Sequence, residues 1–255
     1  LGKVMNVIYT VLDNILPSDV GLVGLSIILY TIIVYMIMMP LTIKQQRTSK
    51  MTSVMNPELT AIRKKYQNKR DQASQLKMNE EMQQVYDKYG TSMTGGCLPM
   101  LIQMVLLFAL YPVVYQMEDY VPAIKNAPAD VQKFLTIPDL SLSPMQMFSE
   151  RAEISSQFGV SSVILIVTAI ALPALSVLTQ YLSMRLSQAI SGQAMDKDNP
   201  MAGTMKTMNI TMPLMSLFFV ISLPAGLGIY WIISAVVRCI QQVIINSHLK
   251  KMSVE

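Results

Sequence analysis

LPAGLGIYWIISAVVR, residues 223–238, joins two apolar segments of the chain. No charged side chain occurs in 207–237, and beyond Arg238 the apolar pattern resumes as far as Ile245. Because about 20 apolar residues cross a hydrocarbon core of roughly 30 Å, 207–245 is long enough for two crossings. Pro224 and Gly226 lie near its middle and are typical of a tight reversal outside the membrane. The second crossing then holds Arg238 at lipid depth, where a charged side chain usually faces a watery cavity and indicates function.

The composition excludes an ordinary soluble domain. Of the 255 residues, 52% are hydrophobic and only 14% are charged, which is typical of a polytopic membrane protein. The two cysteines, Cys97 and Cys239, are too few for a disulfide framework. Both lie near expected cytoplasmic ends of spans, where thiols stay reduced. We therefore expect an all-α membrane protein.

Five apolar segments are expected to span the membrane: 21–43, 97–117, 159–184, 206–222 and 225–245. Pro173 is expected to kink the third span. The external connection 118–153 contains several prolines, which predict short helical pieces. These five spans and their connections, residues 20–255, form the expected core of the protein.

Residues 44–96 are polar and predict an antiparallel helical hairpin on the cytoplasmic side. Asn56-Pro57 predicts a helix start, 68–71 predicts the turn, and Gly90 predicts the end of the hairpin. Each predicted helix carries an apolar stripe, which packing of one helix on the other explains. The basic outer face could instead meet lipid head groups or ribosomal RNA.

The N-terminal segment, residues 1–19, places apolar side chains at helical spacing with polar ones elsewhere on the wheel. This pattern suits an external amphipathic helix lying in the membrane interface. An ordinary packing helix explains the pattern equally well.

The distribution of basic residues predicts the orientation of the chain. Sixteen of the 20 Lys and Arg residues lie on the side that holds the hairpin, the 185–206 loop and the C-terminal end, and four lie on the other side. Because cytoplasmic loops are enriched in Lys and Arg, we expect the N-terminus outside and the C-terminus inside, in a cytoplasmic membrane.

Strongly hydrogen-bonding side chains gather in the cytoplasmic half of the expected spans. At a rise of about 1.5 Å per residue, Tyr35 lies about 13 Å, Arg238 about 10 Å and Gln103 about 9 Å from that face. The remaining members, on spans three and four, are Ser176, Thr179, Ser183 and Asn209. Because such groups are costly in hydrocarbon without partners, the set predicts a water-filled recess open to the cytoplasm. The alternative is that hydroxyl groups bond their own backbones and join helices.

Trp231, Ser234 and Arg238 share one face of the fifth span because they are spaced i, i+3 and i+7. We include all three in the expected substrate-binding recess. Two alternatives stay open: Arg238 could extend to the interface, and Trp231 could be a packing anchor.

Several motifs in a fixed order resemble those of the YidC/Oxa/Alb family of membrane protein insertases over residues 20–245. They are Met39-Pro40-Leu41-Thr42-Ile43-Lys44-Gln45, Asn56-Pro57-Glu58-Leu59, Gly95-Gly96-Cys97-Leu98-Pro99-Met100-Leu101-Ile102-Gln103, Asp139-Leu140, Leu223-Pro224-Ala225-Gly226-Leu227, Tyr230-Trp231 and Gln241-Gln242. With five spans and no large outer domain, the chain looks like the Gram-positive bacterial type.

The resemblance implies a hydrophilic groove that receives the polar outer segment of a substrate, whose hydrophobic helix then slides into the bilayer. It implies nascent membrane proteins as substrates, a recruiting role for the hairpin, and the Sec translocon and the ribosome or signal recognition machinery as possible partners. The chain departs from the family at two places. Many members carry an arginine in span one, where this sequence has Tyr35, and a Ser-Asn pair that is here Ser234-Ala235.

Because Tyr35 and Arg238 lie at similar depth, we hypothesise that Arg238 supplies the positive charge missing from span one. A cation in a low-dielectric recess would attract acidic substrate segments.

Other functional classes fit less well. An intramembrane protease needs a base or paired carboxylates at lipid depth, but His248 is near the C-terminus and no Asp or Glu falls within a span. We therefore expect no enzyme activity, no cofactor, no metal site, no small-molecule substrate and no DNA partner. A small-solute transporter or channel is the main alternative, and a purely structural assembly factor is a third.

Overall fold

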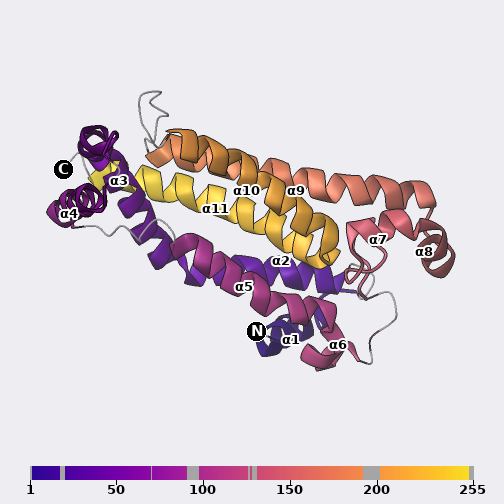
Figure 1. Ribbon diagram of the computed structural model, residues 1–255. Helices are drawn as coiled ribbons and strands as arrows, with labels where there is room; N and C mark the ends of the chain where they lie inside the picture. The colour runs from indigo at the N-terminus through magenta and orange to yellow at the C-terminus, as the bar shows by residue number, and fades with distance from the viewer. Residues whose placement is uncertain are drawn as a thin grey trace. The chain divides into compact units, whose positions relative to one another are not determined.

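The computed structural model describes residues 2–17, 21–69, 71–90, 98–125, 127, 131–191 and 202–252. Regular structure in these residues is helical, apart from one isolated bridge between Phe134 and Ile137. The helices are shown in Figure 1. Their bounds are α1 Gly2–Asp13, α2 Leu22–Ile37, α3 Met39–Tyr66, α4 Gln72–Lys88, α5 Leu98–Tyr115, α6 Met117–Tyr120, the 3₁₀ helix η3 Pro122–Ile124, α7 Pro144–Ser149, α8 Arg151–Phe158, α9 Ser162–Ser191, α10 Ala202–Ser222 and α11 Ala225–Met252.

Apolar helices occur where the sequence predicts spans. Among the described residues, Ser162–Ile190 and Ala225–His248 are each long and apolar enough to cross a membrane. The pair α2 and α3 passes the same test when its two helices are taken as one bent span. Met104–Tyr115 and Pro213–Ser222 are shorter apolar helices at the second and fourth predicted spans. The all-α prediction is therefore confirmed, and the count of five spans stays a prediction.

The first predicted span is not one helix. The structure ends α2 at Ile37 and begins α3 at Met39, with Pro40 in the first turn of α3. Proline has no backbone N–H and its ring clashes with the carbonyl four residues earlier, so Pro40 separates the two helices. Proline is well tolerated in a first helical turn.

The predicted helix start at Asn56-Pro57 is also wrong. α3 runs without interruption from Met39 to Tyr66 and contains Pro57 in its interior. Met55 and Leu59, on either side of Pro57, are buried in one cluster with Met82 and Val85 of α4. This packing keeps α3 continuous although Pro57 has no backbone N–H to donate to the preceding turn. The prediction of short helical pieces in 118–153 is confirmed by α6, η3, α7 and the start of α8.

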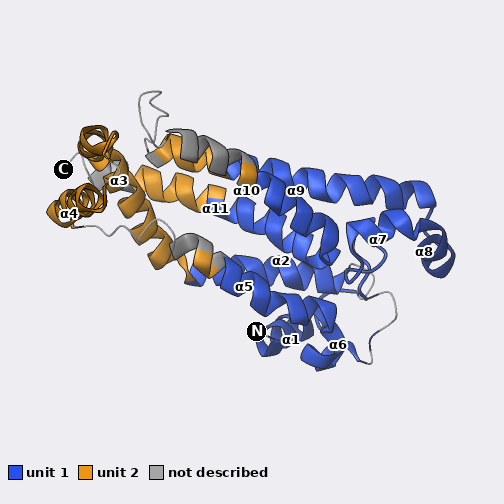
Figure 2. Ribbon diagram, in the orientation of Figure 1, with its two compact units in different colours: residues 1–37, 103–183, 212–238 blue, residues 38–102, 184–211, 239–255 orange. Residues whose placement is uncertain are grey.

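The chain divides into two compact units, coloured separately in Figure 2. The first comprises Leu1–Ile37, Gln103–Ser183 and Met212–Arg238, and the second comprises Met38–Ile102, Met184–Thr211 and Cys239–Glu255. The first unit contains the larger hydrophobic core, to which α1, α2, α5, α9 and α11 contribute. The second contains the small core between α3 and α4.

Helix α1 packs against α2 and η3. Its Met5, Ile8 and Tyr9 are buried, and Asn6 accepts a hydrogen bond at Oδ1 from the N–H of Ala123. The opposite face carries Val4, Val7 and Val11, which are exposed. α1 therefore has one apolar face in the core and a second apolar face uncovered.

The reversal at 223–226 is tied to the segment that follows Asp139. The N–H of Ala225 donates to the carbonyl of Leu142, and the N–H of Gly226 donates to the carbonyl of Leu140. These bonds satisfy two of the N–H groups that have no partner within the first turn of a helix. They connect the start of α11 to the loop before α7. The Pro224-Gly226 pattern predicts the reversal but not this connection.

Gly226 is required by close packing rather than by its dihedral angles. A Cβ at this position would lie 2.8 Å from Val114 Cγ1 and 3.2 Å from Ile27 Cδ1. We predict that Gly226→Ala destabilises the protein by about 1–3 kcal/mol because the core must shift to admit the methyl group. Thermal unfolding of the purified protein in detergent measures the effect.

Gly159→Asn is the matched control. Gly159 has φ +65°, and a Cβ at this position would have no neighbouring atom within 4 Å. Asparagine tolerates this backbone conformation. The melting temperature of the Gly159→Asn variant should therefore stay close to that of the unaltered protein. An unchanged melting temperature for Gly226→Ala would contradict the packing argument.

Candidate functional site

The nine residues of the predicted recess are distributed over five helices. The structure does not describe the side chains of Gln103 in α5 and Asn209 in α10. The other seven belong to the first compact unit. Tyr35, Ser176, Ser183, Trp231 and Ser234 are buried, whereas Thr179 and Arg238 are half-buried.

The structure joins α9 and α11 through a hydrogen bond between Arg238 and Gln180. Arg238 Nη2 donates to Gln180 Oε1 at 2.9 Å. Arg238 is therefore bound to an amide of another helix in the same unit. Gln180 was not among the predicted site residues, although it follows Ser176 by one helical turn and so shares its face.

Two polar atoms of α9, one in Gln180 and one a helical turn before it, have no hydrogen-bond partner among the described residues. They are Ser176 Oγ and Gln180 Nε2, and both are buried. A buried polar group without a partner costs about 1–3 kcal/mol. The face of α9 that carries Ser176 and Gln180 therefore holds hydrogen-bonding capacity that the described residues do not use.

Thr179 and Ser234 bond their own helices. Thr179 Oγ1 donates to the carbonyls of Leu175 at 2.8 Å and Ser176 at 3.0 Å. Ser234 Oγ donates to the carbonyl of Trp231 at 2.8 Å. These two hydroxyl groups therefore have hydrogen-bond partners without water. For Thr179 and Ser234, this matches the alternative in which hydroxyl groups bond their own backbones.

Trp231 packs against an aromatic side chain of α10. Its ring is stacked on that of Phe219, with ring centroids 6.3 Å apart and an interplanar angle of 25°. Because Trp231 is only 8% exposed, its main contacts lie within the unit. This arrangement fits a packing anchor.

A hollow of about 390 Å³ lies between α9 and α10. Ala174, Val177, Leu178, Tyr181, Pro213 and Leu217 line it. It differs in position and polarity from the predicted recess, and its lining suits apolar chains. Among the described residues, no three His, Cys, Asp or Glu side chains are placed to hold a metal ion.

In the second unit, polar contacts connect the start of α3 to the end of α11. Gln46 Nε2 donates to the carbonyl of Gln242 at 3.1 Å, and Lys50 Nζ donates to Asn246 Oδ1 at 2.7 Å. Gln46 is buried. The Gln241-Gln242 motif therefore lies where α11 meets α3.

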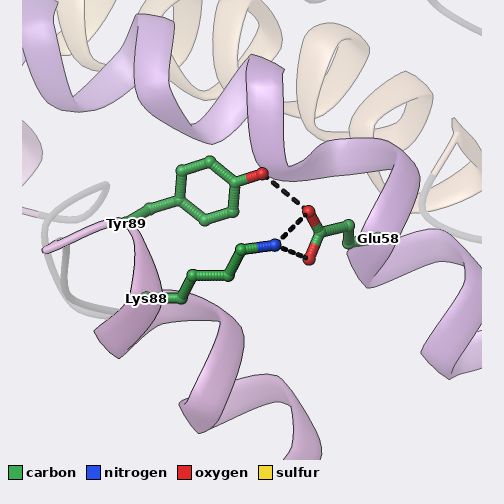
Figure 3. Close-up of polar contacts among 3 residues, drawn as sticks. All are labelled: Glu58, Lys88 and Tyr89. Carbon is green, nitrogen blue, oxygen red and sulfur yellow. Dashed lines mark hydrogen bonds and ion pairs between the residues drawn. The ribbon is translucent and has the colours of Figure 1, made fainter.

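Helices α3 and α4 are joined by two similar polar clusters, each made of a glutamate and a Lys-Tyr pair from the facing helix. Glu58 of α3 accepts hydrogen bonds from Lys88 Nζ at 2.9 Å and from Tyr89 Oη at 2.6 Å (Figure 3). In the second cluster, Glu81 of α4 accepts hydrogen bonds from Lys65 Nζ at 2.6 Å and Tyr66 Oη at 2.8 Å. Glu58 thus pairs with residues at the end of α4, and the end of α3 pairs with Glu81 nearer the middle of α4.

Hydrogen bonding lowers the pKa of both carboxyl groups. Tyr89 contributes most to the lowered pKa of Glu58, followed by Lys88. Lys65 contributes most to the lowered pKa of Glu81, followed by Tyr66. A carboxyl group with a lowered pKa in the folded state stabilises that state above its unfolded pKa, and the contribution is lost as the pH falls through the folded value.

We predict that Glu58→Gln and Glu81→Gln loosen the contact between α3 and α4, since each removes the charge that both donors share. The amide hydrogen-exchange protection of α4 should fall in both variants at neutral pH. Protection in the unaltered protein should fall in the same way as the pH drops below the ordinary carboxyl pKa of about 4.3.

Glu80→Gln is the matched control because Glu80 is exposed on α4 beside Glu81. Equal protection of α4 in Glu58→Gln, Glu81→Gln and Glu80→Gln would show that the two clusters do not hold the helices together.

The sequence has relatives among characterised protein families. A profile of the 60Kd inner membrane protein family matches residues 15–252. Membrane protein insertase YidC 2 of Bacillus anthracis is 28% identical over 224 residues, which are 88% of this chain and 71% of that protein. Membrane protein insertase YidC of Clostridium perfringens is 31% identical over 217 residues, 85% of this chain and 75% of that protein. Membrane protein insertase MisCA of Bacillus subtilis is 29% identical over 210 residues, 82% of this chain and 65% of that protein.

The family profile covers nearly the whole chain and the named relatives agree with one another, so the resemblance seen in the sequence motifs is confirmed. The chain belongs to the 60Kd inner membrane protein family, the family of the YidC membrane protein insertases.

Proposed function

We propose that this protein is a membrane protein insertase that receives polar segments of nascent membrane proteins in a groove open to the cytoplasm and releases their hydrophobic helices into the bilayer. The observation that carries the proposal is the Arg238–Gln180 pair, which places a cation and an amide between apolar helices of a chain from this family. A polar pair at such a position offers a substrate segment an alternative to hydrocarbon.

The outward faces of the apolar helices support a position in the bilayer. On α5, Val105 and Phe108 are exposed, and on α9 Val163, Val167 and Ile170 are exposed. Exposed apolar rows of this kind on a soluble protein would promote aggregation. In a membrane they contact lipid tails, and the chain would cross five times.

The orientation follows from the basic residues. With the N-terminus outside and the C-terminus inside, the α3–α4 hairpin lies in the cytoplasm and α1 lies at the outer interface. The uncovered valines of α1 would then contact the lipid boundary. The hairpin would meet incoming substrates, and the Sec translocon and the ribosome or signal recognition machinery are candidate partners.

Insertion requires no covalent chemistry, so the protein would act as an insertase and chaperone rather than as an enzyme. The groove would lower the cost of moving a polar segment across the bilayer, and the hydrophobic effect would retain the released helix in lipid.

We predict that the purified protein in lipid vesicles inserts a single-span substrate whose short outer segment is polar, at a rate at least tenfold above that of empty vesicles. Protease protection of the outer segment measures insertion. An ion-flux assay on the same vesicles provides the comparison with a transporter or channel.

Vesicles that conduct ions but leave the substrate unprotected would contradict the insertase proposal and favour a channel. A matched substrate with its hydrophobic helix interrupted by two lysines is the control, since it can enter a groove but cannot remain in lipid.

A further inference from the structure

We propose that the turn between Phe134 and Ile137 is a lipid anchor at the outer face of the membrane. Leu135 enters the apolar edge of the outer leaflet, and Lys133 contacts anionic lipid head groups. The inference rests on the proposed position of the protein in the bilayer and adds a lipid-contact site to it.

The backbone of Leu135 is strained. Phe134 and Ile137 exchange two backbone hydrogen bonds, with N–O distances of 3.0 and 2.9 Å, and so enclose a two-residue turn. Leu135 has φ +52° and is the only residue other than glycine with a positive φ in the described parts of the chain. A two-residue turn with positive φ at its first position usually has glycine there, because a Cβ is crowded in this conformation.

Contacts within the described protein do little to offset this strain. The side chain of Leu135 is 81% exposed, more than any other large apolar side chain among the described residues. Glycine or asparagine would adopt the same backbone conformation at a lower cost. A strained position that keeps an exposed leucine indicates a contact with something outside the described residues.

The turn is held firmly between two helices. The ring of Phe134 lies against α2 at Gly24, where a Cβ would overlap it. On the other side, Thr136 Oγ1 accepts a hydrogen bond from Thr168 Oγ1 of α9 at 2.8 Å. The turn therefore joins α2 to α9 and presents Leu135 from a fixed position.

The contacts with α2 also give the level of the turn along the first predicted span, residues 21–43. Gly24 lies near the start of this span. Gly21 is its first residue, and a Cβ on Gly21 would lie 2.8 Å from the carbonyl oxygen of Lys133. In the proposed orientation this end of the span lies at the outer interface, where the head groups meet the hydrocarbon.

The side chains on either side of Phe134 match a lipid surface. Phe134 is half-buried, whereas its neighbours Lys133 and Leu135 are both exposed. An apolar side chain beside a cation is typical of segments that lie in a membrane interface. The apolar side chain enters the acyl boundary, and the cation is attracted to the phosphates of anionic lipids.

The experiment measures thiol reactivity of the full chain in vesicles of phosphatidylcholine, with and without phosphatidylglycerol. Cys97 and Cys239 are replaced, and Leu135→Cys supplies the one thiol. Two maleimides are compared, one charged and confined to water and one apolar and soluble in the bilayer. Glu153→Cys is the matched control, because Glu153 is an exposed, charged residue of the same external connection.

We expect Leu135→Cys to favour the apolar maleimide over the charged one. Its ratio of the two rates should exceed that of Glu153→Cys by about tenfold or more, the preference for lipid that burial of an apolar side chain of this size provides.

Lys133→Gln, added to the Leu135→Cys protein, should lower this ratio by about twofold or more in vesicles with phosphatidylglycerol, because one lysine near an anionic surface contributes a several-fold preference. The ratio should not change in phosphatidylcholine alone. Lys125→Gln is the control for the charge, because Lys125 is an exposed lysine elsewhere in the external connection.

Equal ratios for Leu135→Cys and Glu153→Cys would overturn the lipid contact. A thiol at position 135 that reacts with neither maleimide would also overturn it, and would show that protein covers the turn. Equal ratios for Lys133→Gln and Lys125→Gln would overturn the role of Lys133.

These outcomes leave the proposed function intact, since insertion of the single-span substrate tests it separately. Reaction of Glu153→Cys with the charged maleimide only in inside-out vesicles would instead contradict the proposed orientation.

Discussion

A guanidinium group between apolar helices has to be hydrogen-bonded, and this constraint organises the contact between α9 and α11. Removing a charge from water costs several kcal/mol unless partners replace the water. Here Gln180 is one such partner, and it lies one turn from the buried Ser176. Each unused donor beside this pair adds to the cost, so the arrangement makes sense where water or a substrate reaches it during function.

Other parts of the protein use polar contacts to connect elements rather than to receive a ligand. The backbone bonds from Ala225 and Gly226 to the segment 140–142 tie the start of α11 to the loop before α7. The Glu58 and Glu81 clusters join α3 to α4 at two levels, and the core of Met55, Leu59, Met82 and Val85 joins the same two helices. In these contacts each donor meets an acceptor within the protein. The α9 face with Ser176 and Gln180 differs because it holds donors that have no acceptor among the described residues.

Much of the fold could be predicted because hydrophobic length and turn residues are local signals. The apolar helices, the short pieces of 118–153 and the reversal at Pro224 follow from them. Two boundaries near prolines could not be predicted correctly, because a proline can begin a helix or lie within one. Pro40 separates α2 from α3, but Pro57 lies inside α3, where packing against α4 keeps the helix intact. Sequence alone does not contain that packing.

The candidate site shows a similar division. Periodicity placed Ser176, Thr179 and Arg238 on helix faces, yet it could not identify the atom to which each side chain bonds. Thr179 bonds its own helix, whereas Arg238 reaches Gln180, which is 58 positions earlier in the chain. Contacts between distant segments depend on how the helices pack, so Gln180 could be noticed only as a neighbour of Ser176.

In the proposed recess, water from the cytoplasm reaches the α9 face that carries Gln180. Thiol labelling of Gln180→Cys in a background without Cys97 and Cys239 tests it, because a water-soluble maleimide reacts only with a hydrated thiol. Leu175→Cys, at an exposed apolar position of the same helix, is the comparison. We expect Gln180→Cys to react in inside-out vesicles and not in right-side-out vesicles, and Leu175→Cys to react in neither. A Gln180→Cys protein that stays unlabelled in both, or reacts only from the outside, would contradict it.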